Sequence, residues 1–213
     1  MIRMLQSILF ISLISGCTPL QKTPGAISTY DFGVLYPSNM EMETATTQVP
    51  QSQFAKKSLL IADVSSPAWL DNTAIHYRLM YHNPAQTFTY GNSRWIAAPA
   101  ALFTQQLRDR IASRLNEYVI KDSSTAKTDR ILDIELKELV HLFETTTDSH
   151  VAFGLRASLI ERNSRRLLAQ KDLSITAKAP SPDAAGAVSA ISTASNRIIN
   201  ELIDWLNSVS LND

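Results

Sequence analysis

Few side chains in this sequence could carry catalytic or metal-binding chemistry, and their spacing argues against both. Four histidines are scattered over predicted strands and loops: His76, His82, His141 and His150. His76 and His82 are not at the spacing that places two metal ligands on one helix face. Asp133 and Glu135 share one face of a predicted strand and could form the acid–base pair of a glycosidase. Because Lys137 continues that face, a solvated sheet surface explains the three charges better.

The motifs that mark common enzymes are absent from the sequence. It contains no G-x-S-x-G elbow, no P-loop, no H-E-x-x-H and no G-x-G-x-x-G. Asp31-Phe32-Gly33 has the letters of a kinase metal-binding motif, but the glycine-rich loop and the catalytic-loop signature that accompany it are missing. We therefore predict that the protein is not an enzyme and holds no metal ion or cofactor.

Aromatic residues in the middle of the chain offer binding surface rather than catalysis. Tyr77, Tyr90 and Trp95 could line an apolar groove, although aromatic residues in strands more often belong to the core. Arg78 lies beside Tyr77 and is expected to be a surface or cross-strand pairing residue.

Cys17 is the only cysteine, and it follows a segment typical of exported proteins. Arg3 provides a positive start, and residues 5–14 form an apolar run too short to span a bilayer. Small residues, Ser15 and Gly16, precede Cys17, as in a bacterial lipobox. The alternative is an ordinary secretory signal followed by a chance cysteine. A single thiol excludes an internal disulfide and a cysteine metal site.

Charge and length limit the remaining possibilities. The 213 residues contain 20 basic and 20 acidic side chains, so without residues 1–16, which hold one charge at Arg3, the net charge is near −1. This balance gives no basic surface for nucleic acid or for anionic lipid head groups. We predict a signal peptide at 1–16, a flexible tether at 17–27 and a single domain at 28–213.

The domain is expected to be built around residues 74–119. Alternation over 75–81 and β-forming residues over 87–90 predict two strands. From Pro99, apolar residues recur every four positions at Phe103, Leu107, Ile111 and Leu115, and predict an amphipathic helix reaching Val119. Residues 58–64 read as a buried strand, and residues 36–57 as a polar loop that is either solvated or binds a partner.

Three long strands and a last helix complete the prediction. The strands cover 132–143, 151–159 and 167–178, and an alternation that slips near Lys137 and Glu138 predicts a β-bulge. Short links between them indicate an antiparallel meander. Ser181 is the expected N-cap of a helix that starts at Pro182 and runs to about Leu206. The expected fold is α+β: a single domain with a mostly antiparallel sheet and two amphipathic helices packed on one face.

Residues of the 74–119 segment carry a resemblance to a known family. Their order resembles that of the ABC-type transport auxiliary lipoproteins (PqiC-like), and the matching positions are Ile75, Tyr77, Arg78, Tyr90, Trp95 and Pro99, preceded by residues 30–33. The resemblance implies cleavage after Gly16 and lipid attachment, including palmitate, at Cys17. Each buried methylene contributes about 0.8 kcal/mol, so several acyl chains make a permanent anchor. Thr18 in place of an aspartate favours the outer membrane, with the domain facing the periplasm.

The function implied by the resemblance is a docking or channel-end component of a transport system. Such systems carry a mammalian-cell-entry (MCE) domain protein and move lipids or other hydrophobic molecules across the envelope. The implied partners are the MCE-domain protein and the membrane, but no nucleic acid, and a homo-oligomer is left as an open alternative. The alternative is an outer-membrane assembly or envelope-integrity lipoprotein not linked to transport, and a periplasmic enzyme ranks third.

Overall fold

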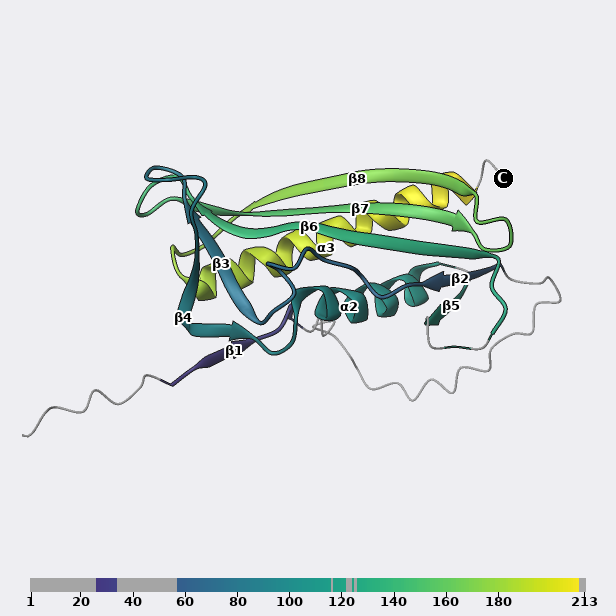
Figure 1. Ribbon diagram of the computed structural model, residues 1–213, viewed down its shortest axis with the longest axis horizontal. Helices are drawn as coiled ribbons and strands as arrows, with labels where there is room; N and C mark the ends of the chain where they lie inside the picture. Colours follow the sequence, from purple (N-terminus) through teal and green to yellow (C-terminus); the bar gives the residue numbers. More distant parts are fainter. Residues whose placement is uncertain (1–25, 34–56, 116, 122–123, 125, 211–213) are drawn as a thin grey trace, which may run out of the picture.

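The computed structural model describes residues 26–33, 57–115, 117–121, 124 and 126–210. Within these residues, the chain forms one domain of eight strands and two helices (Figure 1). The strands are β1 (Ser28–Tyr30), β2 (Ser58–Ile61), β3 (Ala74–Leu79), β4 (Thr87–Trp95), β5 (Tyr118–Lys121), β6 (Arg130–Phe143), β7 (Ser149–Glu161) and β8 (Leu167–Lys178). The helices are α2 (Pro99–Arg114) and α3 (Ala184–Ser210). The predicted signal peptide, Cys17, most of the tether and nearly all of the 36–57 loop lie outside the described residues.

β6 is the strand around which the sheet is arranged. Along its first half, buried residues such as Ile134 alternate with exposed ones such as Glu135, as the sequence pattern predicts. The register with β7 shifts between Leu136 and Glu138, which confirms the predicted β-bulge and returns Leu139 to the buried face. β7 pairs along the whole of β6, while β2 and β3 pair with its two ends on the other side.

The prediction of a mostly antiparallel sheet is wrong. The long strands β6, β7 and β8 do form an antiparallel meander, as their short links indicate. Among the described strands, however, four of the seven pairings are parallel: β1–β4, β2–β5, β2–β6 and β3–β6. The sheet is therefore mixed. Parallel neighbours are joined by long connections, and the periodicity of each strand does not reveal which distant strand it pairs with.

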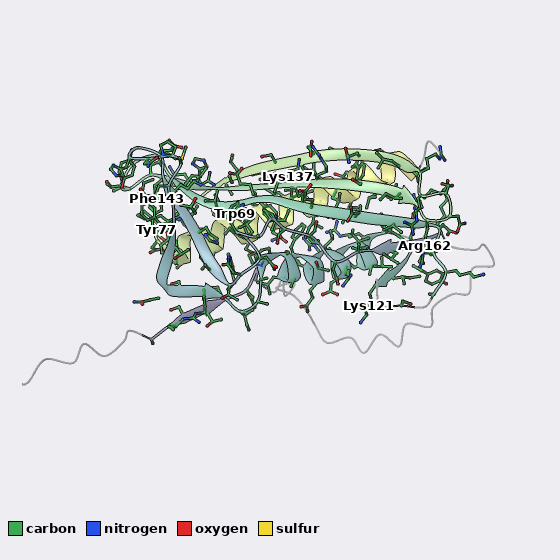
Figure 2. All side chains as sticks on the ribbon, in the orientation of Figure 1. Trp69, Tyr77, Lys121, Lys137, Phe143 and Arg162 are labelled. Carbon is green, nitrogen blue, oxygen red and sulfur yellow. The ribbon has the colours of Figure 1, made fainter. Side chains whose placement is uncertain are left out.

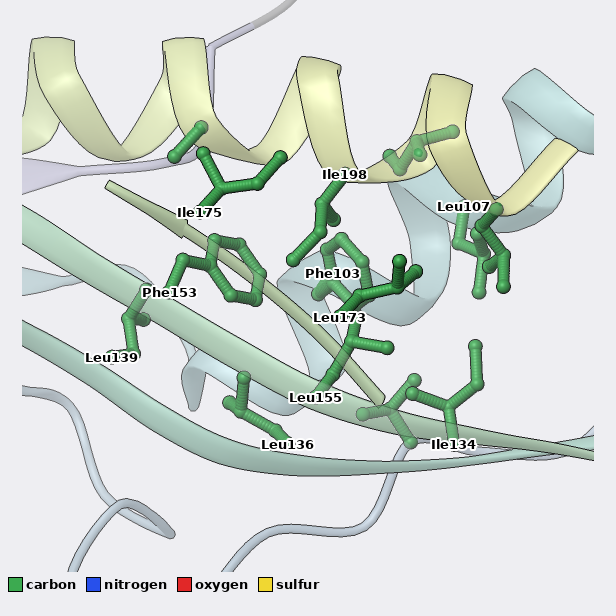
Figure 3. Close-up of a cluster of buried hydrophobic side chains, with 14 of the residues drawn as sticks. Phe103, Leu107, Ile134, Leu136, Leu139, Phe153, Leu155, Leu173, Ile175 and Ile198 are labelled. Atoms are coloured by element: carbon green, nitrogen blue, oxygen red, sulfur yellow. The ribbon is translucent and has the colours of Figure 1, made fainter. Parts of the chain in front are cut away.

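Both helices contribute to one hydrophobic core on the same face of the sheet (Figure 3). The centre of this core contains Phe103 and Leu107 of α2, Phe153 of β7 and Ile198 of α3, all with 0% exposure. The rings of Phe103 and Phe153 meet edge to face at 5.1 Å. Burying each such side chain contributes roughly 1.5–3 kcal/mol, so this contact between helices and sheet holds the domain together.

Three helix boundaries differ from the sequence prediction, and one of them is the end of α3, which lies at Ser210 rather than near Leu206. α2 starts at Pro99 as predicted but ends at Arg114, because Leu115 already has an extended backbone and the chain then forms β5. Val119, expected on the helix stripe, instead pairs with Leu59 of β2. α3 starts two residues later than predicted, and Asp183, rather than Ser181, accepts the N–H of Gly186 at 2.8 Å as its N-cap.

Candidate functional site

Five ring side chains gather at one end of the sheet, and we call this group the aromatic cluster. Its members are Tyr77 of β3, Phe88 and Tyr90 of β4, and His141 and Phe143 of β6. β3 lies between β4 and β6, and Tyr77 is opposite Phe88 on one side and His141 on the other. Figure 2 shows Tyr77 and Phe143 at the same end of the molecule, far from Lys121 and Arg162.

Tyr77 is the centre of the aromatic cluster. Its ring stacks on Phe88 with the centroids 5.3 Å apart, lies 4.8 Å from Tyr90 and meets Phe143 edge to face at 5.8 Å. Aromatic pairs at these separations contribute about 0.5–1.5 kcal/mol each beyond the area that they bury. Tyr77, Phe88 and Tyr90 are only partly buried, so part of the cluster remains accessible at the surface.

A hydrogen bond between Tyr90 and His141 fixes the base of the aromatic cluster. The Tyr90 hydroxyl lies 2.8 Å from Nδ1 of His141, and the ring tautomer decides which group donates. His141 has 0% exposure, and its Nε2 has no hydrogen-bond partner among the described residues. Burial lowers the pKa of His141 to about 4, so the ring is neutral at neutral pH. Burial also raises the pKa of the Tyr90 hydroxyl, which keeps it protonated.

The three aromatic residues that the sequence suggested for one groove do not all lie together in the structure. Tyr77 and Tyr90 touch, but Trp95 has 2% exposure and packs in the core against Phe32 at 5.1 Å. Arg78 is a cross-strand residue as predicted: its Nε donates to Oγ1 of Thr87, which lies opposite it on β4. The histidine and phenylalanines of the cluster were missed, because a lone histidine or phenylalanine in a strand gives no signal for a site.

The charged candidate residues of β6 belong to a solvated face of the sheet. Asp133 and Glu135 lie on the exposed face of β6, as the solvated interpretation predicts. Lys137 and Arg156 both bond the carboxylate of Asp172 on that face, and the Arg156 guanidinium is the main reason that the pKa of Asp172 falls to about 2. Within the part of the chain that the structure describes, no three His, Cys, Asp or Glu side chains could hold a metal ion. None of the described helices is long and apolar enough to cross a membrane.

Two of the open cavities that the described residues form flank α2. The first, of about 700 Å³, lies between α2 and the segments that contain Asp63, Asp71 and Lys121. The second, of about 660 Å³, lies between α2 and the end of β1, and we call it the α2–β1 cavity. Both volumes fall in the range of roughly 300–1,000 Å³ typical of small-molecule sites.

The described part of this α+β domain thus offers a partly exposed aromatic cluster at one end of the sheet and two cavities beside α2. A family model for the ABC-type transport auxiliary lipoprotein component matches residues 40–202. The chain therefore belongs to this family of envelope-associated lipoproteins, which confirms the resemblance read from the sequence. No curated protein matches the chain.

Solved structures share the fold at low sequence identity. Protein XCC0632 from Xanthomonas campestris matches with a TM-score of 0.66 and 18% identity over 73% of this chain and 87% of its own. An uncharacterized protein matches with a TM-score of 0.63 and 12% identity over 85% of this chain and 99% of its own. The hypothetical protein CT253 from Chlamydia trachomatis matches with a TM-score of 0.51 and 9% identity over 74% of this chain and 99% of its own. At these identities, the matches support the fold alone.

Proposed function

We propose that this protein is the outer-membrane lipoprotein of an ABC transport system that carries an MCE-domain protein. Acyl chains on Cys17, including palmitate, anchor it, and the domain faces the periplasm. It serves as the docking or channel-end component through which lipids or other hydrophobic molecules pass across the envelope. Membership in the transport auxiliary lipoprotein family is the observation that carries the proposal.

The geometry of the aromatic cluster supports a docking role. Protein interfaces are enriched in aromatic side chains, and a hot spot is most effective when the free protein already holds it in place. Tyr77 meets this requirement, since Phe88, Tyr90 and Phe143 surround it. A tether from the membrane to the domain raises the effective concentration of the cluster for a periplasmic partner.

Affinity purification of the full-length tagged lipoprotein from cross-linked envelopes tests the proposal. Recovery of an MCE-domain protein supports it, and recovery of only barrel-assembly or cell-wall proteins contradicts it. Tyr77→Ala should reduce the recovered MCE protein about tenfold or more, as expected when an interface hot spot of at least 1.4 kcal/mol is lost. Lys137→Ala, a change on the exposed face of β6, is the matched control and should leave the recovery unchanged.

The anchor has a separate test. Cells grown with labelled palmitate should transfer the label to the full-length protein and not to the Cys17→Ala variant. The labelled protein should be found with the outer membrane after the two membranes are separated. A mature product found free in soluble extracts, with an unmodified thiol, would contradict both the anchor and the location.

The second candidate function is an outer-membrane assembly or envelope-integrity lipoprotein not linked to transport. The aromatic cluster favours it as well, since the cluster offers binding surface without specifying the partner. Genes for a permease, an ATPase and an MCE protein beside this gene would support the transport role. Their absence, together with purification of barrel proteins alone, would support the second role.

A further inference from the structure

The α2–β1 cavity combines apolar and charged walls. Phe32, Ile96 and Leu102 provide its apolar part, and Asp31, Asp109 and Arg110 provide its charges. Ile96 is 65% exposed, an unusual state for a large aliphatic side chain beside an open cavity. A surface of this composition fits a ligand that has both a charged and an apolar end.

Arg110 forms no ion pair with any of the described residues that line this cavity. Its Nη2 donates a 3.3 Å hydrogen bond to Oδ1 of Asn196 on α3, while its Nε is buried and has no hydrogen-bond partner among the described residues. No described carboxylate lies within ion-pair distance of its guanidinium. A guanidinium keeps its charge in proteins, and a charge that is partly removed from water favours binding of an anion. Its fork of N–H groups matches the oxygens of a phosphate.

Two carboxylates line the same cavity. Asp109 and Asp31 are exposed, and neither forms an ion pair within the described part of the chain. One oxygen of Asp31 accepts the N–H of Gly33 at 2.8 Å, which holds this side chain at the end of β1. With one positive and two negative side chains, the cavity would repel a simple anion such as a fatty acid. It complements a ligand that carries a phosphate and, next to it, an ammonium group.

From this arrangement, we infer that the α2–β1 cavity binds the head group of a zwitterionic phospholipid with a primary ammonium group. Arg110 binds the phosphate, and the carboxylates of Asp109 and Asp31 bind the ammonium group. The start of one acyl chain lies against Ile96 and Leu102. The volume of about 660 Å³ holds a head group and the beginning of a chain rather than a whole two-chain lipid. The inference deepens the proposed transport function, because it names the class of lipid that the domain contacts.

Photo-cross-linking of the full-length lipoprotein in living cells tests the inference. The photoreactive residue p-benzoylphenylalanine replaces Ile96, and mass spectrometry identifies the lipids attached after irradiation. Tyr118, which is 58% exposed and lies outside the cavity, is the control position. We expect phosphatidylethanolamine on position 96 at about tenfold the level on position 118, a difference of about 1.4 kcal/mol.

Variants of the charged residues identify the contacts. Arg110→Gln should reduce the labelling at position 96 about tenfold, whereas Arg114→Gln, at an exposed arginine on the same helix outside the cavity, should leave it unchanged. Because Arg110 also bonds α3, circular dichroism must first show that its variant is folded. Asp109→Asn changes an exposed side chain and should remove the preference for phosphatidylethanolamine over phosphatidylglycerol without abolishing lipid labelling.

Several outcomes would overturn the inference. Equal labelling at positions 96 and 118 would mean that the nearby membrane is labelled rather than a bound lipid. Labelling by phosphatidylglycerol alone, or labelling that is the same in Arg110→Gln and in the unchanged protein, would rule out the assigned head group. Recovery of the MCE-domain protein, measured on the same cells, separates this result from the proposed function: normal recovery without lipid labelling refutes the cavity and leaves the transport role intact.

Discussion

Replacing Tyr90 by phenylalanine tests whether the hydrogen bond beneath the aromatic cluster stabilises the domain. The substitution keeps the ring, and hence the contact with Tyr77 at 4.8 Å, but removes the hydroxyl that lies 2.8 Å from Nδ1 of His141. His141 has 0% exposure and its Nε2 already lacks a partner among the described residues, so the variant leaves both ring nitrogens unbonded. Leaving a buried polar atom unsatisfied costs about 1–3 kcal/mol, and we expect a loss of this size in the free energy of unfolding.

Urea unfolding, monitored by circular dichroism, measures this loss in stability. Two further variants test whether the loss comes from the hydrogen bond itself. Tyr77→Phe removes a hydroxyl that forms no hydrogen bond with the described residues, so we expect a change within about 0.5 kcal/mol. The double variant Tyr90→Phe, His141→Leu removes both partners and should cost at least about 1 kcal/mol less than the sum of the two single changes. Equal losses in Tyr90→Phe and Tyr77→Phe, or additive effects in the double variant, would refute the assigned role of the bond.

The same histidine should make the domain sensitive to acid. The folded-state pKa of His141 is about 4, below its ordinary value of 6.5, because burial penalises the charged ring. Between these values, the unfolded chain binds a proton that the folded chain does not, so stability falls as the pH falls from about 6.5 towards 4. The loss due to this residue is at most on the order of 3 kcal/mol. Burial also lowers the pKa of His76, so the contribution of His141 is measured as the difference between the unchanged protein and His141→Leu.

Two further substitutions test the packing of the fold. Gly186→Ala should destabilise the protein by about 1–3 kcal/mol, because an added Cβ would lie 2.0 Å from the carbonyl oxygen of Ser181. Alanine otherwise favours a helix by about 1 kcal/mol. Gly91→Ala is the control and should stay within about 0.5 kcal/mol, because no described residue other than its chain neighbours lies within 4 Å of the added Cβ. Glu117→Gln should cost about 1–3 kcal/mol, because it replaces a charge-assisted hydrogen bond to the buried guanidinium of Arg130 with a neutral one. Urea unfolding checks both, and a neutral result for Gly186→Ala or for Glu117→Gln would contradict the corresponding contact.

Local signals in the sequence predicted the elements that depend on local physics. Alternation placed β6, β7 and β8, and the phase slip beside Glu138 located the β-bulge, because side chains on neighbouring positions of a strand must face opposite sides. Pro99 marked the start of α2, because a proline has no N–H that the first turn would leave unbonded. These predictions required no knowledge of which segments meet in space.

Contacts between distant segments could not be predicted in this way. The sequence of β5 predicts the end of a helix followed by a polar link. In the structure it is a strand, because Tyr118 to Lys121 pair with β2. The α2–β1 cavity combines Asp31 at the end of β1, Ile96 after β4 and Arg110 on α2. The parallel pairing of β1 with β4 brings the first two together, and the periodicity of a single strand does not reveal that pairing.

The aromatic cluster shows why a site can be invisible in a sequence that contains all of its residues. Tyr90 and His141 are 51 positions apart, and β3 separates their strands in the sheet. Their side chains reach one another because β3, the strand between them, pairs with both β4 and β6 and places Tyr77 opposite Phe88 on one side and His141 on the other. Each of the three residues has an ordinary explanation when taken alone, as a strand aromatic or a scattered histidine. Their chemical character, a buried neutral imidazole beneath partly exposed rings, arises from the order of the strands, so predicting the site from sequence requires that order to be known first.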